Sequence, residues 1–194
     1  MSDWDYEGLV GTEFHGKRVV HGRSDLHDGL YVRFALRALS WCVLAALLLI
    51  LAAVRAFGAD AQANALLISE GQRIGVQSLR TGKQHSVLQA MAQRHADYQA
   101  RCGVQGHQGW NSRVQELYRD VADCGTFSEV ANESWPGQDN RAAAAEMYHS
   151  WRQSPGHWSA VNGRCAYWGY AMSFCPGNRT WYAAGVFGES RRFR

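Results

Sequence analysis

The chain has 194 residues, of which 46% are hydrophobic, and its formal net charge is +3 at pH 7. This length accommodates one ordinary domain together with extra segments. A net charge this small gives no argument for nucleic-acid binding, and the basic end at residues 191–194 is interpreted as a solvated terminus.

The first 57 residues divide into a polar part and an apolar part. Residues 1–32 mix acidic and basic side chains with Gly and His and show no hydrophobic period, so we interpret them as a flexible cytoplasmic tail. Residues 33–57 are strongly apolar and carry no charge from Ala38 to Val54. This length spans a bilayer when the flanking arginines extend their stems to the interface, which predicts one transmembrane helix over 33–57.

Two other interpretations of the apolar segment were weighed. A buried core helix normally keeps a polar stripe, and no residue from Trp41 to Val54 supplies one. A cleaved signal peptide is compatible with Ala59-Asp60-Ala61 as a cleavage pattern, but the preceding polar segment is long for a signal peptide. Cys42 lies inside the predicted span and is interpreted as a small apolar residue.

The orientation of the span is predicted from two independent signals. Arg33 and Arg37 flank its N-terminal end whereas Arg55 stands alone at the other, which favours a cytoplasmic N-terminus. An even number of cysteines follows the span, as expected for disulfides in an oxidising compartment: Cys102, Cys124, Cys165 and Cys175. We therefore predict a C-terminal domain on the periplasmic or extracellular side of a membrane.

The outer part of the chain is predicted to be a linker over residues 58–65 and a domain over 66–190. Helices are expected over residues 61–100, with a break near Thr81-Gly82, over 112–121, and over 140–151 with Asn140 as N-cap. Residues 167–174 alternate with a two-residue period, Pro176-Gly177-Asn178 forms a turn, and residues 180–187 form a second strand. Helices ahead of a small antiparallel sheet predict an α+β domain.

Strand geometry restricts the disulfides. Cys165 and Cys175 lie at opposite ends of one predicted strand, roughly 30 Å apart, whereas a disulfide brings two Cα atoms within about 7 Å. The two are not expected to pair with each other. Cys102 and Cys124 are instead predicted to pair separately with Cys165 and Cys175, in either combination.

The region around His157 carries the most informative motif. Ser154-Pro155-Gly156 ends the preceding helix, so we predict that His157 is presented on a loop. The motif Trp151-x-x-Ser-Pro-Gly-His157 resembles the second histidine motif of the CAP superfamily (cysteine-rich secretory, antigen 5 and pathogenesis-related proteins) in its bacterial form. The resemblance extends from about Leu66 to Gly188. It includes Gly106-His107 with Arg113, and also Trp181-Tyr182 and Val186-Phe187-Gly188. In addition, Glu133-Ser-Trp stands where the family usually has Gly-Glu-Asn.

This resemblance implies a three-layer α-β-α sandwich, here preceded by the transmembrane helix, with two histidines and one or two acidic residues around a cavity. The implied cavity residues are His107, Glu129, Glu133, Ser154 and His157. Ser154 stands where eukaryotic members have a second glutamate, which leaves the acidic set incomplete. Glu133 is preferred for the cavity, and Glu129, within Ser128-Glu129-Val130, is the alternative. Members of the family bind a divalent metal such as Zn²⁺ there, for which His107, Glu133 and His157 are the candidate ligands.

Three functions are compatible with these observations. The first is a ligand-binding module at the cell envelope that takes a lipid, a peptide or a protein. The second is a metal-dependent hydrolase of peptide or cell-wall material, with Glu133 or Glu129 as ligand or general base. The third is a structural component of an envelope or viral membrane assembly. No Ser-His-Asp arrangement or phosphate-binding loop is apparent, and the helical histidines His85, His95 and His149 are interpreted as hydrogen-bonded or exposed.

Overall fold

The computed structural model describes residues 39, 41–49 and 60–191. Contacts divide the chain into two units, residues 1–50 and 51–194. In the first unit residues 39 and 41–49 are helical, and the rest of the predicted span and the tail over 1–32 lie outside the described residues. Among the residues that are described, no helix combines the length and the apolar character needed to cross a membrane.

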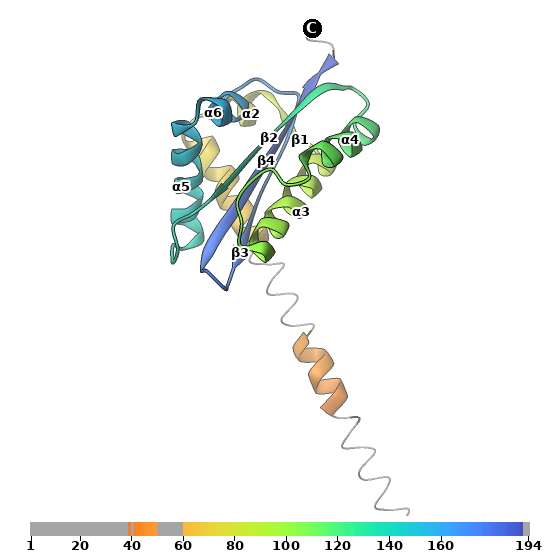
Figure 1. Cartoon of the computed structure of the whole chain (residues 1–194), viewed down its shortest axis with the longest axis vertical. Coiled ribbons are helices and arrows are strands. Elements are labelled where there is room, and N and C mark those ends of the chain that lie inside the picture. The colour runs from red at the N-terminus through yellow and green to blue at the C-terminus, as the bar shows by residue number, and fades with distance from the viewer. Residues whose placement is uncertain (1–38, 40, 50–59, 192–194) are drawn as a thin grey trace, which may run out of the picture. The chain divides into compact units, whose positions relative to one another are not determined.

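The second unit alternates helices with the strands of one sheet (Figure 1). Residues 60–73 form a first helical segment. The elements that follow are α2 (Gln77–Thr81), β1 (Lys83–Gln84), α3 (Ser86–Cys102), α4 (Trp110–Asp120), β2 (Cys124–Glu133), α5 (Asn140–Gln153), α6 (Pro155–Val161), β3 (Tyr167–Cys175) and β4 (Thr180–Ser190). This arrangement confirms the predicted α+β class and the predicted β3–β4 hairpin.

The sheet has the strand order β1-β3-β4-β2. β4 pairs antiparallel with both β3 and β2, while the short β1 pairs parallel with β3. β2 is therefore an edge strand, and it is the one long strand that the sequence pattern did not predict. It begins at the buried Cys124 and ends at the exposed Glu133.

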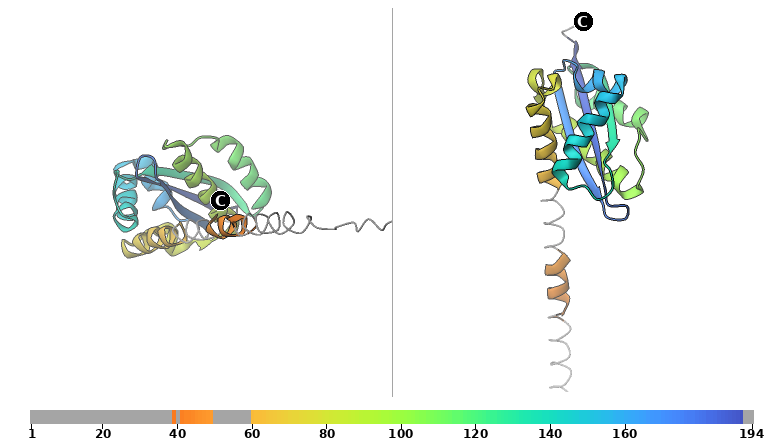
Figure 2. Two further views of the ribbon diagram at one scale, coloured as in Figure 1. Left: turned by 90° about the horizontal axis from the view of Figure 1, so that it is seen from below. Right: turned by 90° about the vertical axis from the view of Figure 1, so that its left-hand side faces the viewer.

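Successive residues of the central strands face opposite sides of the sheet, and each side is covered by helices. Tyr170 and Met172 pack with residues of α5 and of the 60–73 segment in one core, whereas Ala171 packs with α3 and α4 in the other. Figure 2 shows α5 and the 60–73 segment over the same face of the sheet. The result is an α-β-α arrangement of layers, as the family resemblance implied.

The layer formed by α3 lies very close to the sheet. The buried side chains of α3 recur at helical spacing, from Leu88 through Met91 and Ala92 to Ala96. Opposite them stands Gly169, where an added Cβ would collide with the backbone of Leu88 and Gln89. A glycine in the middle of β3 thus permits α3 to approach the strand backbone directly.

Residues 60–65, at the start of the described part of this unit, are helical and pack on the domain, since Ala63 is buried in the core and Asn64 accepts a hydrogen bond from the Met172 amide at 2.7 Å. Two local predictions differ from the structure. The N-cap of α5 is Asp139, whose carboxylate accepts from the Ala142 amide at 2.8 Å, and Asn140 is the first helical residue. His157 lies on the short helix α6 rather than on a loop, because Pro155 occupies the first helical turn, where proline is favourable.

The predicted disulfides are absent: Cys102, Cys124, Cys165 and Cys175 are all free in the described structure. Cys124 belongs to the core between the sheet and α3, whereas Cys165 packs against the core on the opposite face. The sheet therefore separates these two thiols, a relation that strand spacing along the sequence did not reveal.

Candidate functional site

His107 lies in the loop between α3 and α4, and contacts with α3 fix this loop at Gly103 and at Gly106. Gly103 ends α3 in the left-handed conformation with φ of 63°, a conformation that glycine adopts without steric cost. Further along, the Gly106 amide donates to Gln99 Oε1 at 3.1 Å. The buried Gln99 in turn donates to the Ala183 carbonyl of β4 at 3.2 Å, so the loop is tied through α3 to the centre of the sheet.

His95 holds the same loop residue, Gly106, through its carbonyl group. Its side chain is on the buried face of α3 and only 2% of the residue is exposed. His95 Nε2 lies 2.7 Å from the Gly106 carbonyl oxygen, and because a carbonyl only accepts, Nε2 carries the proton. Burial lowers the pKa of His95, although the neighbouring Glu129 acts in the opposite direction. The neutral imidazole therefore acts as a fixed donor beside His107.

Glu129, on β2, connects the residues that surround it. Its side chain is 1% exposed and forms a two-point ion pair with Arg113 of α4, in which Arg113 Nη2 donates to Oε1 at 3.0 Å and Nη1 donates to Oε2. The same Oε1 lies 3.0 Å from His107 Nδ1 and 3.6 Å from His95 Nε2. A buried carboxylate requires compensation of this kind, since isolated it would be strongly destabilising.

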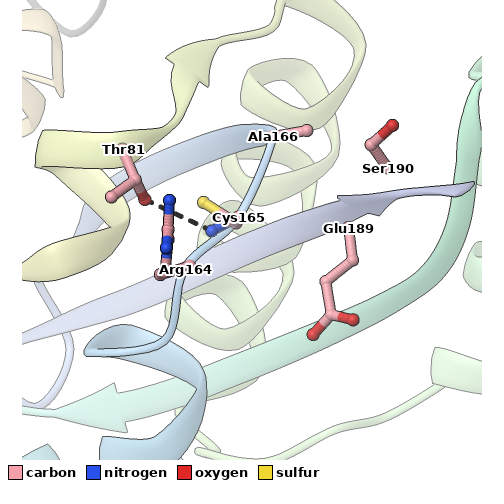
Figure 3. A pocket seen from close by; sticks show the side chains of 6 residues that line it. All are labelled: Thr81, Arg164, Cys165, Ala166, Glu189 and Ser190. Atoms are coloured by element: carbon pink, nitrogen blue, oxygen red, sulfur yellow. Dashed lines mark hydrogen bonds between the residues drawn. The ribbon is translucent and has the colours of Figure 1, made fainter. Parts of the chain in front are cut away.

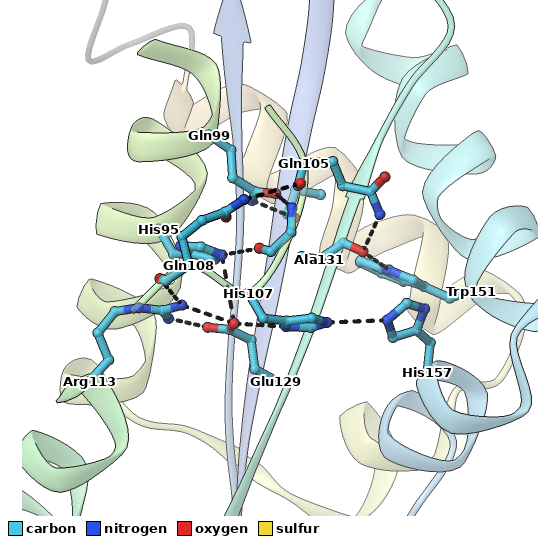
Figure 4. A network of polar contacts seen from close by, with 12 residues as sticks. His95, Gln99, Gln105, His107, Gln108, Arg113, Glu129, Ala131, Trp151 and His157 are labelled. Atoms are coloured by element: carbon cyan, nitrogen blue, oxygen red, sulfur yellow. Dashed lines mark hydrogen bonds and ion pairs between the residues drawn. The ribbon is translucent and has the colours of Figure 1, made fainter. Parts of the chain in front are cut away.

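The two histidines of the predicted site face each other over the edge strand (Figure 4). The Nε2 atoms of His107 and His157 are 3.5 Å apart, and the ring centroids are 5.7 Å apart. His107 comes from the layer that contains α3 and α4, while His157 comes from α6 on the other side of the sheet. They can meet because β2 is an edge strand, past which side chains from both layers extend.

The protonation pattern of the pair follows from the contacts of His107. Its Nδ1 faces the Glu129 carboxylate, so Nδ1 carries the proton and Nε2 presents a lone pair toward His157. Desolvation, and secondly the neighbouring His107, lower the pKa of His157. The lowered pKa of His157 favours its neutral form, and a neutral imidazole nitrogen is the form that binds metal ions or accepts a hydrogen bond from a ligand.

Not all predicted site residues come together. Glu129, the alternative in the sequence analysis, contacts His107, whereas the preferred Glu133 is exposed at the end of β2 and lines a different cavity. Ser154 ends α5 and precedes α6, where its side chain makes no capping hydrogen bond. Within the described part of the chain, no group of three or more His, Cys, Asp or Glu side chains is arranged to hold a metal ion.

Three residues of the site were missed as functional candidates: His95, Gln99 and Arg113. The spacing of α3 contained a signal for the first two, because both fall on its apolar face, and a polar side chain at a core position requires a partner. Arg113 was noted in the motif around His107, but its role as the ion-pair partner of Glu129 depends on the contact between α4 and β2, which the spacing from His107 does not encode. The remaining helical histidines have local roles: His85 Nδ1 caps α3 by accepting from the Val87 amide, and His149 is exposed.

A second cavity, of about 450 Å³, lies near the C-terminal end of β4 (Figure 3). Its lining residues are Thr81, Arg164, Cys165, Ala166, Glu189 and Ser190. Burial, and secondly Glu189, raise the pKa of the Cys165 thiol to about 12. The nucleophilic thiolate is therefore scarce at neutral pH, and this cavity does not have the properties of a cysteine-based catalytic site.

Comparisons with known proteins add little to this geometry. No protein-family model matches the chain, and no curated protein matches its sequence. Among solved structures, an outer surface protein from Borrelia burgdorferi aligns with a TM-score of 0.48 and 12% identity, over 64% of this chain and 87% of its own. The structure titled BmVAL-1 aligns with a TM-score of 0.42 and 20% identity, over 56% of this chain and 59% of its own. Both TM-scores are below 0.5, and both identities are below 25%.

Proposed function

We propose that the chain is an extracytoplasmic ligand-binding domain of the CAP type, and that its binding site is the pair of imidazoles formed by His107 and His157. The observation that carries the proposal is their 3.5 Å approach over β2, with Glu129 oriented against the far nitrogen of His107. Glu129 and His157 are 22 and 50 positions from His107 along the chain, and only the fold brings them together.

A divalent cation such as Zn²⁺ is the ligand best suited to two imidazole nitrogens that lie this close together. With Zn–N bonds of about 2.05 Å, two nitrogens on one tetrahedral ion lie about 3.4 Å apart, close to the observed separation of the Nε2 atoms. Glu129 would orient His107 from behind, as carboxylates do for metal-bound histidines. Such an ion would be held by His107 and His157 alone, so its other positions would be filled by water or by an external ligand.

The geometry favours binding over hydrolysis. A general base needs a free proton-accepting group directed at the substrate, but both oxygens of Glu129 are occupied by Arg113 and one also by His107. Glu133, the other candidate base, makes no hydrogen bond or ion pair with either histidine. We therefore place the hydrolase hypothesis second, and a purely structural role third.

The cellular placement is part of the same proposal. We propose that the apolar segment over residues 33–57 anchors the protein in a membrane with the outer domain on the periplasmic or extracellular side, where lipids, peptides and envelope proteins are the available ligands. Deletion of residues 33–57 should move the protein from the membrane fraction to the supernatant. Retention of the shortened chain on the membrane would contradict this anchoring.

Zinc binding tests the site directly. The full chain, purified in detergent and treated with a chelator, should bind one equivalent of Zn²⁺ in a calorimetric titration near neutral pH, and more weakly as acidification protonates the imidazoles. His107→Ala and His157→Ala should each abolish this binding, since each removes one of two ligands. His149→Ala removes an exposed histidine elsewhere and should leave it unchanged.

The opposite results are equally informative. Zinc binding that survives both substitutions would locate the ion elsewhere, for example at the free cysteines, and would contradict the proposed site. No zinc binding at all would remove the metal from the proposal. The imidazole pair would then have to be tested as a direct ligand contact, by the effect of the same variants on binding of envelope lipids.

A further inference from the structure

A separate cavity of about 540 Å³ adjoins the far end of β2. It is formed by the end of β2 with the segment that follows it, by α5, by the loop after α3 and by the β3–β4 hairpin. The residues on which the argument depends are Asn132, Glu133, Trp135, Glu146, Ser150 and Tyr182. None of His107, Glu129 and His157 lines it, and the proposed function does not use it.

Asn132 supplies the first observation that points to a ligand. Only 6% of this residue is exposed, and its Oδ1 accepts from Ser150 Oγ at 3.2 Å, but its buried Nδ2 has no hydrogen-bond partner among the residues that the structure describes. Exchanging the amide oxygen and nitrogen does not remove the problem, because Ser150 would then satisfy the nitrogen and leave the oxygen unpaired. A ligand hydroxyl satisfies either arrangement, since it can donate or accept.

The charges around this cavity are not compensated. Neither Glu133 nor Glu146 takes part in any ion pair formed by the described residues. The contact of Glu133 is with the neutral hydroxyl of Tyr182, which itself accepts from Asn178 Nδ2 at 2.8 Å. The cavity therefore offers carboxylates that can accept hydrogen bonds from hydroxyl or ammonium groups, and it disfavours anionic ligands.

Trp135 supplies the apolar part of the site. It is 67% exposed, whereas Trp151 is fully buried and Trp168 and Trp181 are nearly so. A large exposed indole beside polar groups is typical of a binding surface, since one ring face can cover the apolar C–H face of a ligand. The combination of an open aromatic face, an unpaired amide and carboxylates matches the groups of a sugar ring.

We propose that this cavity is a saccharide-binding site in which a sugar ring stacks on Trp135 while its hydroxyls reach Asn132 and the carboxylates of Glu133 and Glu146. The uncompensated acids select for a sugar that carries a free amine. Hexosamine units therefore bind more tightly than their N-acetylated forms, and uronic acids do not bind.

The test uses three soluble trisaccharides: the glucosamine trimer, the N-acetylglucosamine trimer and the galacturonate trimer. Each is titrated calorimetrically into the full chain in a detergent without a sugar headgroup. The expected order of affinity is glucosamine trimer, then N-acetylglucosamine trimer, with no saturable binding of galacturonate. Trp135→Ala should weaken binding of the glucosamine trimer about tenfold, as loss of one aromatic contact does, without unfolding the domain, because the side chain is exposed.

Two further variants separate the contributions. Glu146→Gln should reduce the preference for the glucosamine trimer over the N-acetylated trimer while retaining binding of both. Tyr118→Ala removes a partly exposed aromatic side chain on α4, away from the cavity, and should change neither affinity.

The proposal is overturned if no trimer binds saturably up to millimolar concentration, or if Trp135→Ala binds as the parent does, since binding would then reflect charge alone. Loss of zinc binding in the His107 variant leaves this result unaffected, so the two proposals fail independently.

Discussion

Strand β2 carries two glutamates in opposite electrostatic situations, Glu129 in its middle and Glu133 at its end. The Glu129 side chain is 1% exposed and is surrounded by Arg113, His107 and His95, whereas Glu133 is exposed and pairs with no cation in the described structure. The two carboxylates are four residues apart, about 13 Å along the strand, and they point to the same side because strand side chains alternate. The two carboxylates differ in solvent exposure, because α4 covers Glu129 whereas Glu133 lies at the exposed end of the strand.

This difference indicates different tasks. A fully satisfied carboxylate fixes the groups around it and has little capacity left for a ligand, so Glu129 is best described as a positioning residue for His107. An unsatisfied carboxylate in a cavity retains its capacity for an external partner. Glu129, in the middle of the strand, thus fixes neighbouring side chains, whereas Glu133, at its end, is proposed to contact a ligand.

The largest expected contrast comes from neutralising the two glutamates separately. Glu129→Gln leaves Arg113 buried without its counter-charge and is expected to lower the free energy of unfolding by about 3–5 kcal/mol. Glu133→Gln alters an exposed group and should change it by no more than about 0.5 kcal/mol. Urea denaturation of both variants measures the contrast, and equal effects would show that the ion pair at Glu129 contributes little.

Acidification should lower the stability of the folded domain through His95, which lies beside Glu129. The pKa of His95 is lowered in the folded protein, so below its ordinary value of about 6.5 the unfolded chain binds more protons than the folded chain. Stability therefore falls as the pH drops from about 7.5 to 5.5, a range that spans this value. The charged neighbours that act on His95 are Glu129, Arg113 and His107.

His95→Gln is the matching variant, because an amide can still donate to the Gly106 carbonyl but does not titrate. Urea denaturation at both pH values should show a smaller loss of stability on acidification than in the parent. His149→Gln replaces an exposed histidine and should leave the loss unchanged. A pH dependence that persists in full in His95→Gln would assign it to other groups.

The smallest contrast is expected between two variants near the Glu133 end of β2. Ser150→Ala removes the hydroxyl that pairs with Asn132 and should cost about 1 kcal/mol, because it leaves a second atom of that buried amide unpaired. Gln105→Ala removes only a long, partly buried hydrogen bond of 3.3 Å to the Ala131 carbonyl and should cost about half as much. Thermal unfolding of the two variants distinguishes them, and an unchanged melting temperature in Ser150→Ala would indicate that water replaces the hydroxyl.

Sequence reasoning was most successful where a periodic pattern coincided with burial. The β3–β4 hairpin was predicted because Tyr167 to Phe174 alternate and a Pro-Gly-Asn turn follows. β2 was missed because Val130, Ala131 and Asn132 are all buried in succession, so the strand lacks alternation at its most important part. Because helices cover both faces of this edge strand, its sequence does not alternate between apolar and polar residues and resembles that of an irregular segment.

The choice between Glu129 and Glu133 was beyond the reach of sequence pattern. Both fall on the same side of β2, and both stand in segments that resemble the family motif. Only the placement of α4, which brings Arg113 over Glu129, distinguishes them. By contrast, the pairing of His107 with His157 was anticipated, because the motif around Trp151 and His157 identified the second histidine even though its helix was not predicted.

The position of the imidazole pair has a mechanical consequence. His107 belongs to one helical layer and His157 to the other. A ligand that binds both rings would therefore link the two layers. The link would lie at β2, beyond which no further strand continues the sheet among the described residues. Binding energy gained there adds to the resistance of the domain to unfolding, by RT ln(1 + [L]/Kd) for a ligand that binds only the folded state. Melting temperature is thus a direct gauge of occupancy, and ligands can be sought by heating the protein in their presence before any activity is known.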